Sequence, residues 1–188
     1  MEECEMYCPN TNSWSKITSL PVPMNNFAGL VDEATNSIFL SGGFTKVRGG
    51  SNFNTFYCYK PEEKIVLELP KLLNNRGSHI MIKLLNGDIA LVGGQDHPFT
   101  GRSVWTIETY NIHRKQWMVF DKSKPRGPLA REFRLNHQQV DNTIIIWAID
   151  FINSGQEILE YNFSMKKWRS TTQTKSEFEV LDIARRLM

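Results

Sequence analysis

A tyrosine followed by a tryptophan recurs about every fifty residues and constrains the fold of this chain more than any other feature. In each pair the tyrosine stands seven positions before the tryptophan: Tyr7 with Trp14, Tyr110 with Trp117, and Tyr161 with Trp168. Tyr59 keeps the same column, but Val66 stands where its tryptophan is expected. A period near 50 is typical of stacked supersecondary units. The spacing therefore predicts a repeat architecture built from four related segments.

A second column consists of glycine pairs. Gly42-Gly43 and Gly93-Gly94 each lie 17 residues before the tyrosine of their own repeat. Glycine adopts positive φ without strain and allows another backbone to come close, so a pair of glycines indicates a tight contact at the end of a strand. In the last repeat Ala148-Ile149 replaces the glycine pair. We expect the connection after Trp147 to differ from its equivalents.

One repeat, residues 78–120, shows what a single unit contains. Its first apolar stretch ends at Asn86-Gly87, a strong hairpin signal. The short apolar run 89–92 is typical of a buried strand. Two more strand-like stretches, 104–110 and 116–120, flank a polar turn. Four strands joined by polar turns are one blade of a β-propeller.

The order of these columns resembles the kelch repeat, in which a glycine pair follows the second strand and a tyrosine and a tryptophan follow it. The resemblance runs from Met1 to about Thr172, with Val66 and Ala148-Ile149 as departures. It implies an all-β fold, a kelch-type β-propeller segment of about three and a half four-stranded blades. A tryptophan on the outer strand is expected to pack between adjacent blades.

Domain bounds can be set from the columns. We expect residues 1–22 to form the outer half of a first blade, 23–70 and 71–122 to form kelch blades, 123–172 to form a divergent kelch blade, and 173–188 to form a tail that is either a short helix or the start of a further strand. Propellers typically have 4 to 8 blades. A full-length protein or an oligomer is therefore expected to be needed to close the ring.

Composition excludes several classes of function. The 188 residues include 22 basic and 20 acidic side chains, a net charge of +2 that is too small and too scattered to predict nucleic-acid binding. No apolar stretch approaches the roughly 18 residues of a membrane span. The acidic amino terminus does not resemble a signal peptide. We therefore expect the three cysteines, Cys4, Cys8 and Cys58, to be reduced thiols in a cytoplasmic protein.

Candidate partner-binding residues lie in the loops. Connections after the second strand of a blade, and connections between blades, emerge on the same face because strand direction alternates. The candidates there are Arg48, Arg76, Asp96, His97, Arg102, Arg126 and Arg131. In kelch proteins of the ubiquitin-ligase adaptor kind, such loop arginines bind acidic partner peptides. Of the candidates, only Arg76 and Arg131 stand in a repeat column that matches those arginines. The alternative is that they are ordinary solvated loop arginines.

Histidines and cysteines give no metal-site signal. The four histidines lack metal-ligand spacing. His79 and His137 are expected in inner strands, either lining a central channel or hydrogen-bonded within the sheet. Cys4 shares a column with Phe56, Ile107 and Ile158, which predicts a buried structural thiol. No cofactor and no metal are expected.

The sequence favours a non-catalytic module that binds protein partners. The resemblance suggests substrate recognition for a cullin-type ubiquitin ligase, or alternatively actin and cytoskeleton binding. No BTB or F-box segment is evident in these residues, so the first role would rest on sequence outside them. Some copper oxidases also have a kelch-like propeller with tyrosine and cysteine at the metal, and Cys58 between Tyr57 and Tyr59 leaves that enzyme class as a further alternative.

Overall fold

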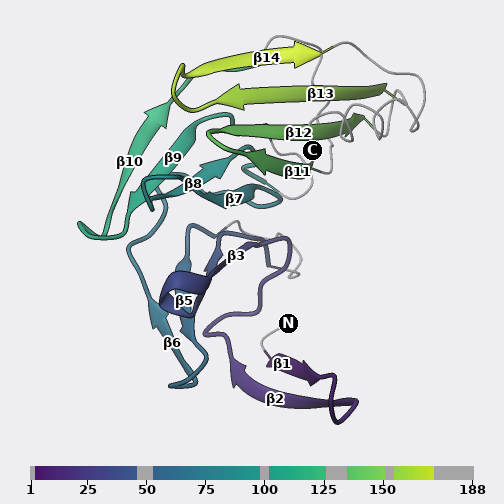
Figure 1. Ribbon diagram of the computed structural model, residues 1–188, viewed down its shortest axis with the longest axis vertical. Coiled ribbons are helices and arrows are strands. Elements are labelled where there is room, and N and C mark those ends of the chain that lie inside the picture. The colour runs from purple at the N-terminus through teal and green to yellow at the C-terminus, as the bar shows by residue number, and fades with distance from the viewer. Residues whose placement is uncertain (1–2, 46–52, 98–101, 126–134, 151–154, 172–188) are drawn as a thin grey trace. The chain divides into compact units, whose positions relative to one another are not determined.

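The computed structural model describes residues 3–45, 53–97, 102–125, 135–150 and 155–171. These residues form antiparallel sheets: one two-stranded hairpin and three sheets of four strands each (Figure 1). A single turn of 3-10 helix is the one helical element among them. The predicted all-β propeller fold is confirmed. The chain divides into two compact units, residues 1–120 and 121–188.

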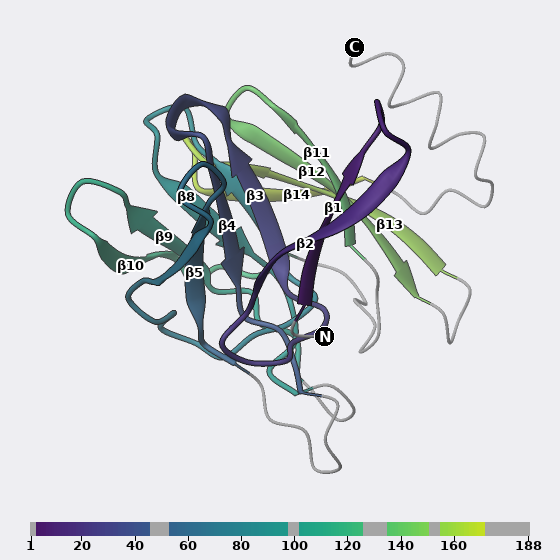
Figure 2. The same cartoon turned by 90° about the horizontal axis from the view of Figure 1, so that it is seen from below.

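The chain begins with the hairpin of β1 (Glu3–Cys8) and β2 (Ser13–Ser19). Figures 1 and 2 show it as a separate two-stranded ribbon. Tyr7 lies opposite Trp14 across the hairpin, with ring centroids 5.3 Å apart. The Tyr7 hydroxyl donates to Asn12 Oδ1 (2.8 Å) in the connecting turn, where Asn12 has φ 48°. The repeated tyrosine thus helps to close the turn that leads to the tryptophan strand.

The next sheet contains four strands in chain order. They are β3 (Ala28–Asp32), β4 (Ser37–Ser41), β5 (Phe56–Lys60) and β6 (Ile65–Glu68). The 3-10 turn η1 (Glu33–Thr35) joins β3 to β4. Asp32 caps it by accepting from the Ala34 amide (3.2 Å) and the Thr35 hydroxyl (2.8 Å). This side-chain capping replaces the hairpin chemistry that an Asn-Gly turn supplies elsewhere.

The third sheet repeats this plan. It consists of β7 (Ile80–Lys83), β8 (Ile89–Val92), β9 (Ile107–Asn111) and β10 (Gln116–Asp121). The third strand begins three residues later than the sequence predicted. Val104 instead donates its amide to the Gly94 carbonyl (2.8 Å), and Ser103 forms a bridge with Gln95, so this segment pairs with the preceding loop.

Sheets β3–β6 and β7–β10 pack face to face through a shared apolar core. Its buried members are Ala28, Phe39, Phe56, Cys58, Leu72, Met81, Ile89, Leu91, Tyr110 and Trp117. The Phe56 ring lies 5.0 Å from the rings of both Tyr110 and Trp117. Trp117 also donates its indole N–H to the Pro70 carbonyl (2.8 Å), two residues after β6 ends. Trp117 therefore lies between adjacent blades and satisfies its polar atom there.

The glycine pairs allow the blades to approach at the ends of their inner strands. Gly42 has φ 62° and Gly43 has φ 99°. A Cβ on Gly42 would lie 2.2 Å from the Arg76 carbonyl oxygen, which also accepts the Gly43 amide (2.8 Å). At the next pair, a Cβ on Gly94 would lie 2.8 Å from the Gly77 carbonyl oxygen. Only glycine fits these contacts, which explains the second column of the repeat.

The second unit holds the sheet of β11 (Leu135–Val140), β12 (Thr143–Asp150), β13 (Gly155–Asn162) and β14 (Lys167–Thr171). Trp168 donates to the Ser123 carbonyl (3.3 Å), two residues after β10 ends, and so repeats the contact of Trp117 with Pro70. The Tyr161 hydroxyl donates to Asp121 Oδ2 (2.6 Å). The indole contact of the tryptophan column is therefore present in both units.

Strand β12 is lengthened by the loss of the glycine pair. It has eight residues, whereas β4 has five and β8 has four. Because Ala148 and Ile149 do not end the strand with positive φ, pairing with β13 continues to Asp150 opposite Gly155. The predicted tail, residues 173–188, lies outside the described residues. Within the part of the chain that the structure describes, no helix is long and apolar enough to cross a membrane.

Candidate partner-binding face

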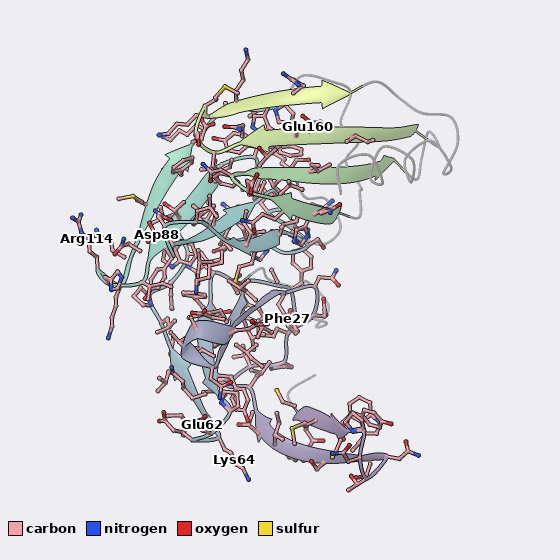
Figure 3. All side chains as sticks on the ribbon, viewed as in Figure 1. Phe27, Glu62, Lys64, Asp88, Arg114 and Glu160 are labelled. Carbon is pink, nitrogen blue, oxygen red and sulfur yellow. The ribbon has the colours of Figure 1, made fainter. Side chains whose placement is uncertain are left out.

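The strand order of the first unit separates two ends of its sheets. The connections between blades, and those after the glycine pairs, emerge at one end, which we call the loop face. The tight turns after β5, β7 and β9 emerge at the other end, which we call the turn face. Figure 3 labels Phe27 on the connection that leads into β3, and labels Glu62, Lys64, Asp88 and Arg114 on the turns.

Arg76 does not reach the surface of the loop face. Its side chain is 0% exposed. The guanidinium donates to the carbonyls of Gly93 (3.2 Å) and Thr106 (3.0 Å) and pairs with Glu108 Oε1 (2.5 Å). The expectation that Arg76 grips a partner is therefore wrong, because every one of these acceptors belongs to this chain. Burial lowers the pKa of Arg76, and the carboxylate of Glu108 opposes that shift.

Glu108, which the sequence reading missed, completes a buried network. It is fully buried on β9 and accepts from the Leu73 amide (2.9 Å) and from Asn74 Nδ2 (2.6 Å) as well as from Arg76. The network joins the connection between blades to the third strand of the next blade. The sequence signal for this network was a glutamate between Ile107 and Thr109 in a predicted strand. A charged side chain buried in a strand requires a partner of opposite charge or hydrogen-bond donors.

His79 is a further buried polar group beneath the loop face. Its Nε2 lies 2.8 Å from Ser41 Oγ. Burial, with a smaller effect of the Arg76 charge, lowers its pKa to about 3. The imidazole is therefore neutral at physiological pH and acts as a hydrogen-bonded residue between sheets rather than as a channel lining. His137, by contrast, lies on β11 with its side chain exposed.

Asp96, His97 and Arg102 lie on the loop that follows the second glycine pair. Asp96 and Arg102 are exposed, and His97 is half-buried. The Asp96 amide donates to the Arg102 carbonyl (3.1 Å), and the Arg102 amide donates to Asp96 Oδ1 (2.6 Å). These two bonds fix the base of the loop while the guanidinium stays in solvent. Arg48, Arg126 and Arg131 lie outside the described residues.

Two exposed apolar residues join this face and were also missed. Leu73 on the connection after β6 is 50% exposed, although Glu108 holds its backbone amide. Phe27 on the connection before β3 is exposed as well. Each adds exposed apolar area to the loop face. An apolar residue in a polar connection was the sequence signal for both.

Cys58 does not share a side of its sheet with the tyrosines that flank it in the sequence. Across β4, β5 and β6 the register places Tyr57 and Tyr59 on one side of the sheet and Cys58 on the other. Cys58 is buried in the core, which raises the pKa of its thiol. Cys4 is half-buried and packs on the cluster of Leu20, Met24 and Tyr57, consistent with a structural thiol. In the described part of the chain no three histidine, cysteine or acidic residues are grouped as metal ligands.

Curated proteins similar to this chain carry kelch repeats. The chain is 29% identical over 125 residues to Kelch repeat and BTB domain-containing protein 2 of Cowpox virus (strain GRI-90 / Grishak), which covers 66% of this chain and 20% of the viral protein. It is 27% identical over 119 residues to Kelch-like protein 36 of Rattus norvegicus, which covers 62% of this chain and 19% of the rat protein. The chain thus spans about a fifth of the length of these relatives.

A solved structure supports the same fold. YjhT, a kelch-type propeller, matches with a TM-score of 0.65 at 14% identity, over 87% of this chain and 56% of YjhT. No protein-family model matches the chain. The period, the glycine pairs, the four-stranded sheets and the curated relatives agree. The repeats are kelch repeats, and the chain is a segment of a kelch-type β-propeller.

Proposed function

We propose that this chain is a non-catalytic protein-interaction module that binds its partner through the loop face. The observation that carries the proposal is that the loop face has buried, hydrogen-bonded polar groups beneath it and exposed side chains on its surface. Beneath it, Arg76, Glu108 and His79 are buried and bonded within the chain. Above it, Arg102 and Leu73 project from backbone that is held by hydrogen bonds. Exposed side chains on a rigid scaffold are where binding energy is concentrated.

Several residues supply the chemistry for a partner. Arg102 offers forked donors to acidic groups. Leu73 and Phe27 offer apolar contact area. We retain Arg48, Arg126 and Arg131 as members of the same proposed set, together with Asp96 and His97. The partner that fits this mixture is a protein segment carrying carboxylates next to apolar side chains.

We further propose substrate recognition for a cullin-type ubiquitin ligase as the cellular role. The support is that curated relatives are named as kelch repeat and BTB domain-containing proteins. The expected location is then the cytoplasm. Actin or cytoskeleton binding stays the alternative role, and it uses the same module. The two differ in what a capture experiment recovers.

Affinity capture from cell extract with matched charge reversals tests the proposal. Arg102→Glu alters the loop face, and Arg114→Glu makes the same change on the turn face, where Arg114 is exposed. An interface hot spot costs about 2 kcal/mol or more in binding, which is roughly a thirtyfold loss of affinity. We expect Arg102→Glu to lose the partner and Arg114→Glu to keep it.

The identity and the pattern of the captured proteins decide between the roles. A protein whose ubiquitination depends on this chain supports substrate recognition, whereas recovery of actin filaments supports the alternative. Loss of all partners with Arg114→Glu, and none with Arg102→Glu, would place binding on the turn face and overturn the proposal. Equal melting temperatures of the two variants exclude unfolding as the cause.

A further inference from the structure

Strand β6 has one paired edge and one open edge. It is the last strand in the sheet order β3-β4-β5-β6, so β5 is its one strand partner among the described residues (Figure 1). The open edge of an end strand is a template on which a further strand can pair. The loop face lies at the ends of the strands, whereas this edge runs along the length of β6. The two surfaces are therefore distinct.

The pairing register shows which backbone groups of β6 point away from β5. Opposite residues of an antiparallel pair alternate between hydrogen-bonded pairs and pairs without hydrogen bonds. The Leu69 amide donates to the carbonyl of Phe56, the residue opposite it (2.8 Å). Leu67, two positions earlier, has the same orientation as Leu69. Val66 and Glu68 therefore turn their N–H and C=O groups towards the open edge.

The side chains of β6 differ between the two sides of its sheet. Val66 packs on the cluster that contains Leu20 and Tyr57. Ile65 and Leu67 point to the other side and are 39% and 42% exposed. A strand added at the open edge lies beside these two apolar side chains, because neighbouring strands place their side chains in cross-strand pairs. The edge therefore favours an occupant with apolar residues at alternate positions.

The segment around β6 is acidic. Residues 61–69 contain three glutamates and one lysine, which leave a net charge of −2; they are Glu62, Glu63, Glu68 and Lys64. All four side chains are exposed. Within the described part of the chain the three glutamates form no ion pair, and Glu62 accepts from the neutral Asn36 amide (3.0 Å). Uncompensated acidic groups along an edge favour a basic occupant.

Strand β10 provides a natural comparison within the same unit. It too is an end strand, in the order β10-β9-β8-β7. The equivalent segment, residues 112–120, has two basic residues, Arg114 and Lys115, and no acidic residue, a net charge of +2 with His113 neutral. Figure 3 labels Glu62 on the turn before β6 and Arg114 on the turn before β10. The two outer edges thus differ in the sign of their charge.

We propose that the open edge of β6 binds an extended basic segment of a partner protein by strand addition. The backbone of that segment bonds to the outward N–H and C=O groups of Val66 and Glu68. Its apolar residues, at alternate positions, lie beside Ile65 and Leu67, and its lysines or arginines meet the glutamates. In strand addition the backbone bonds supply affinity and the alternate side chains supply specificity. The inference does not depend on what the loop face binds.

A synthetic peptide, acetyl-Lys-Val-Thr-Val-Thr-Lys-amide, tests the proposal on the full chain at low salt. Anisotropy of the labelled peptide measures affinity, and amide hydrogen exchange followed by NMR locates the binding site. We expect saturable binding and slower exchange at the Val66 and Glu68 amides. Exchange at Leu67 should not change, because its amide already faces β5. A peptide with glutamate in place of both lysines should bind at least about tenfold more weakly.

Matched variants separate the backbone contribution from the charge contribution. Glu68→Pro removes an outward N–H and keeps the bonds to β5, so it should abolish binding with little change in Tm. Glu68→Gln removes the charge alone and should retain binding. Glu62→Gln with Glu63→Gln should weaken binding about fivefold, which corresponds to about 1 kcal/mol for two exposed ion pairs. The control, Arg114→Gln with Lys115→Gln near β10, should not weaken it.

Other results overturn the proposal. Saturable binding without slower exchange at Val66 and Glu68 would place the peptide elsewhere, and equal affinity for the lysine and glutamate peptides would refute a basic occupant. Self-association that Glu68→Pro abolishes would make a second copy of the chain the occupant. Arg102→Glu should bind the peptide as the parent does, and loss of binding there would merge this site with the loop face. If Glu68→Pro fails to fold, the Glu62→Gln and Glu63→Gln double variant decides.

Discussion

The buried ion pair of Arg76 with Glu108 makes the sharpest prediction about what holds the connection after β6 to sheet β7–β10. Arg76→Ala removes donors to the carbonyls of Gly93 and Thr106 and leaves the Glu108 carboxylate without its counter-charge. The Leu73 amide and Asn74 side chain remain as donors to Glu108 but carry no charge. Breaking a buried pair from one side typically costs about 3–5 kcal/mol.

That cost is a large part of a domain's stability, which is typically about 5–15 kcal/mol. For a domain of about 150–250 residues, 1 kcal/mol lowers Tm by roughly 2–4 °C, so the loss corresponds to roughly 6–20 °C. Urea unfolding followed by tryptophan fluorescence measures the free energy of unfolding, and calorimetry measures Tm. Trp117 reports on the unfolding of this part of the chain because it packs in the core between sheets β3–β6 and β7–β10.

A double variant shows whether the cost comes from the uncompensated charge. Arg76→Met with Glu108→Leu removes both charges and keeps apolar volume, so it should recover most of the stability that Arg76→Ala loses. Arg102→Ala, at an exposed position on the same face, should change stability by less than about 0.5 kcal/mol. Arg76→Ala with parental stability would refute the network as a stabilising element. A double variant no better than the single one would refute the charge argument.

Further predictions concern the repeat columns and pH. Trp117→Ala should lower the free energy of unfolding by about 3–5 kcal/mol, measured by chemical unfolding. Trp14 is 68% exposed, so Trp14→Ala should lower it by less than about 0.5 kcal/mol. Equal losses of stability in the two variants would contradict the interblade role of Trp117. Gly42→Ala should destabilise the chain more than Gly87→Ala. Both glycines have positive φ, and the backbone strain common to both variants is about 1–2 kcal/mol. Only at Gly42 would the added Cβ also meet a carbonyl oxygen, at 2.2 Å. The pKa of His79 is about 3 in the folded chain, below its usual 6.5. Between these two pH values the unfolded chain therefore binds more protons than the folded chain. The free energy of unfolding accordingly falls as the pH falls from 6.5 towards 3. The loss between pH 7 and pH 5 should be about 2 kcal/mol, and a His79→Gln variant that keeps the same pH slope would exclude His79 as its source.

The parts of the structure that the sequence predicted rest on local, repeated chemistry. The glycine pairs at 42 and 93 end inner strands because positive φ and close backbone approach both require glycine. Trp117 and Trp168 keep the tryptophan column because each donates to a backbone carbonyl two residues beyond an outer strand, at Pro70 and Ser123. The extension of β12 results from the absence of such a pair at Ala148.

The features that the sequence did not predict depend on contacts between distant segments. Arg76 lies in the connection between β6 and β7, where arginine is normally solvated. Its burial depends on its pairing with Glu108 on β9. Nothing near Arg76 in the chain identifies that partner. The exposure of Leu73 and Val31 likewise reflects which neighbouring strands cover them, and this information is absent from a local pattern.

Hydrogen–deuterium exchange of the chain with its captured partner tests the central claim most directly, because it locates the binding face without mutation. We predict slower exchange on binding in the connections of the loop face, 70–79 and 93–97, while exchange in the turns 61–64 and 112–115 stays the same. Protection confined to those turns would contradict the assignment of the loop face as the partner-binding surface of this kelch-type propeller segment.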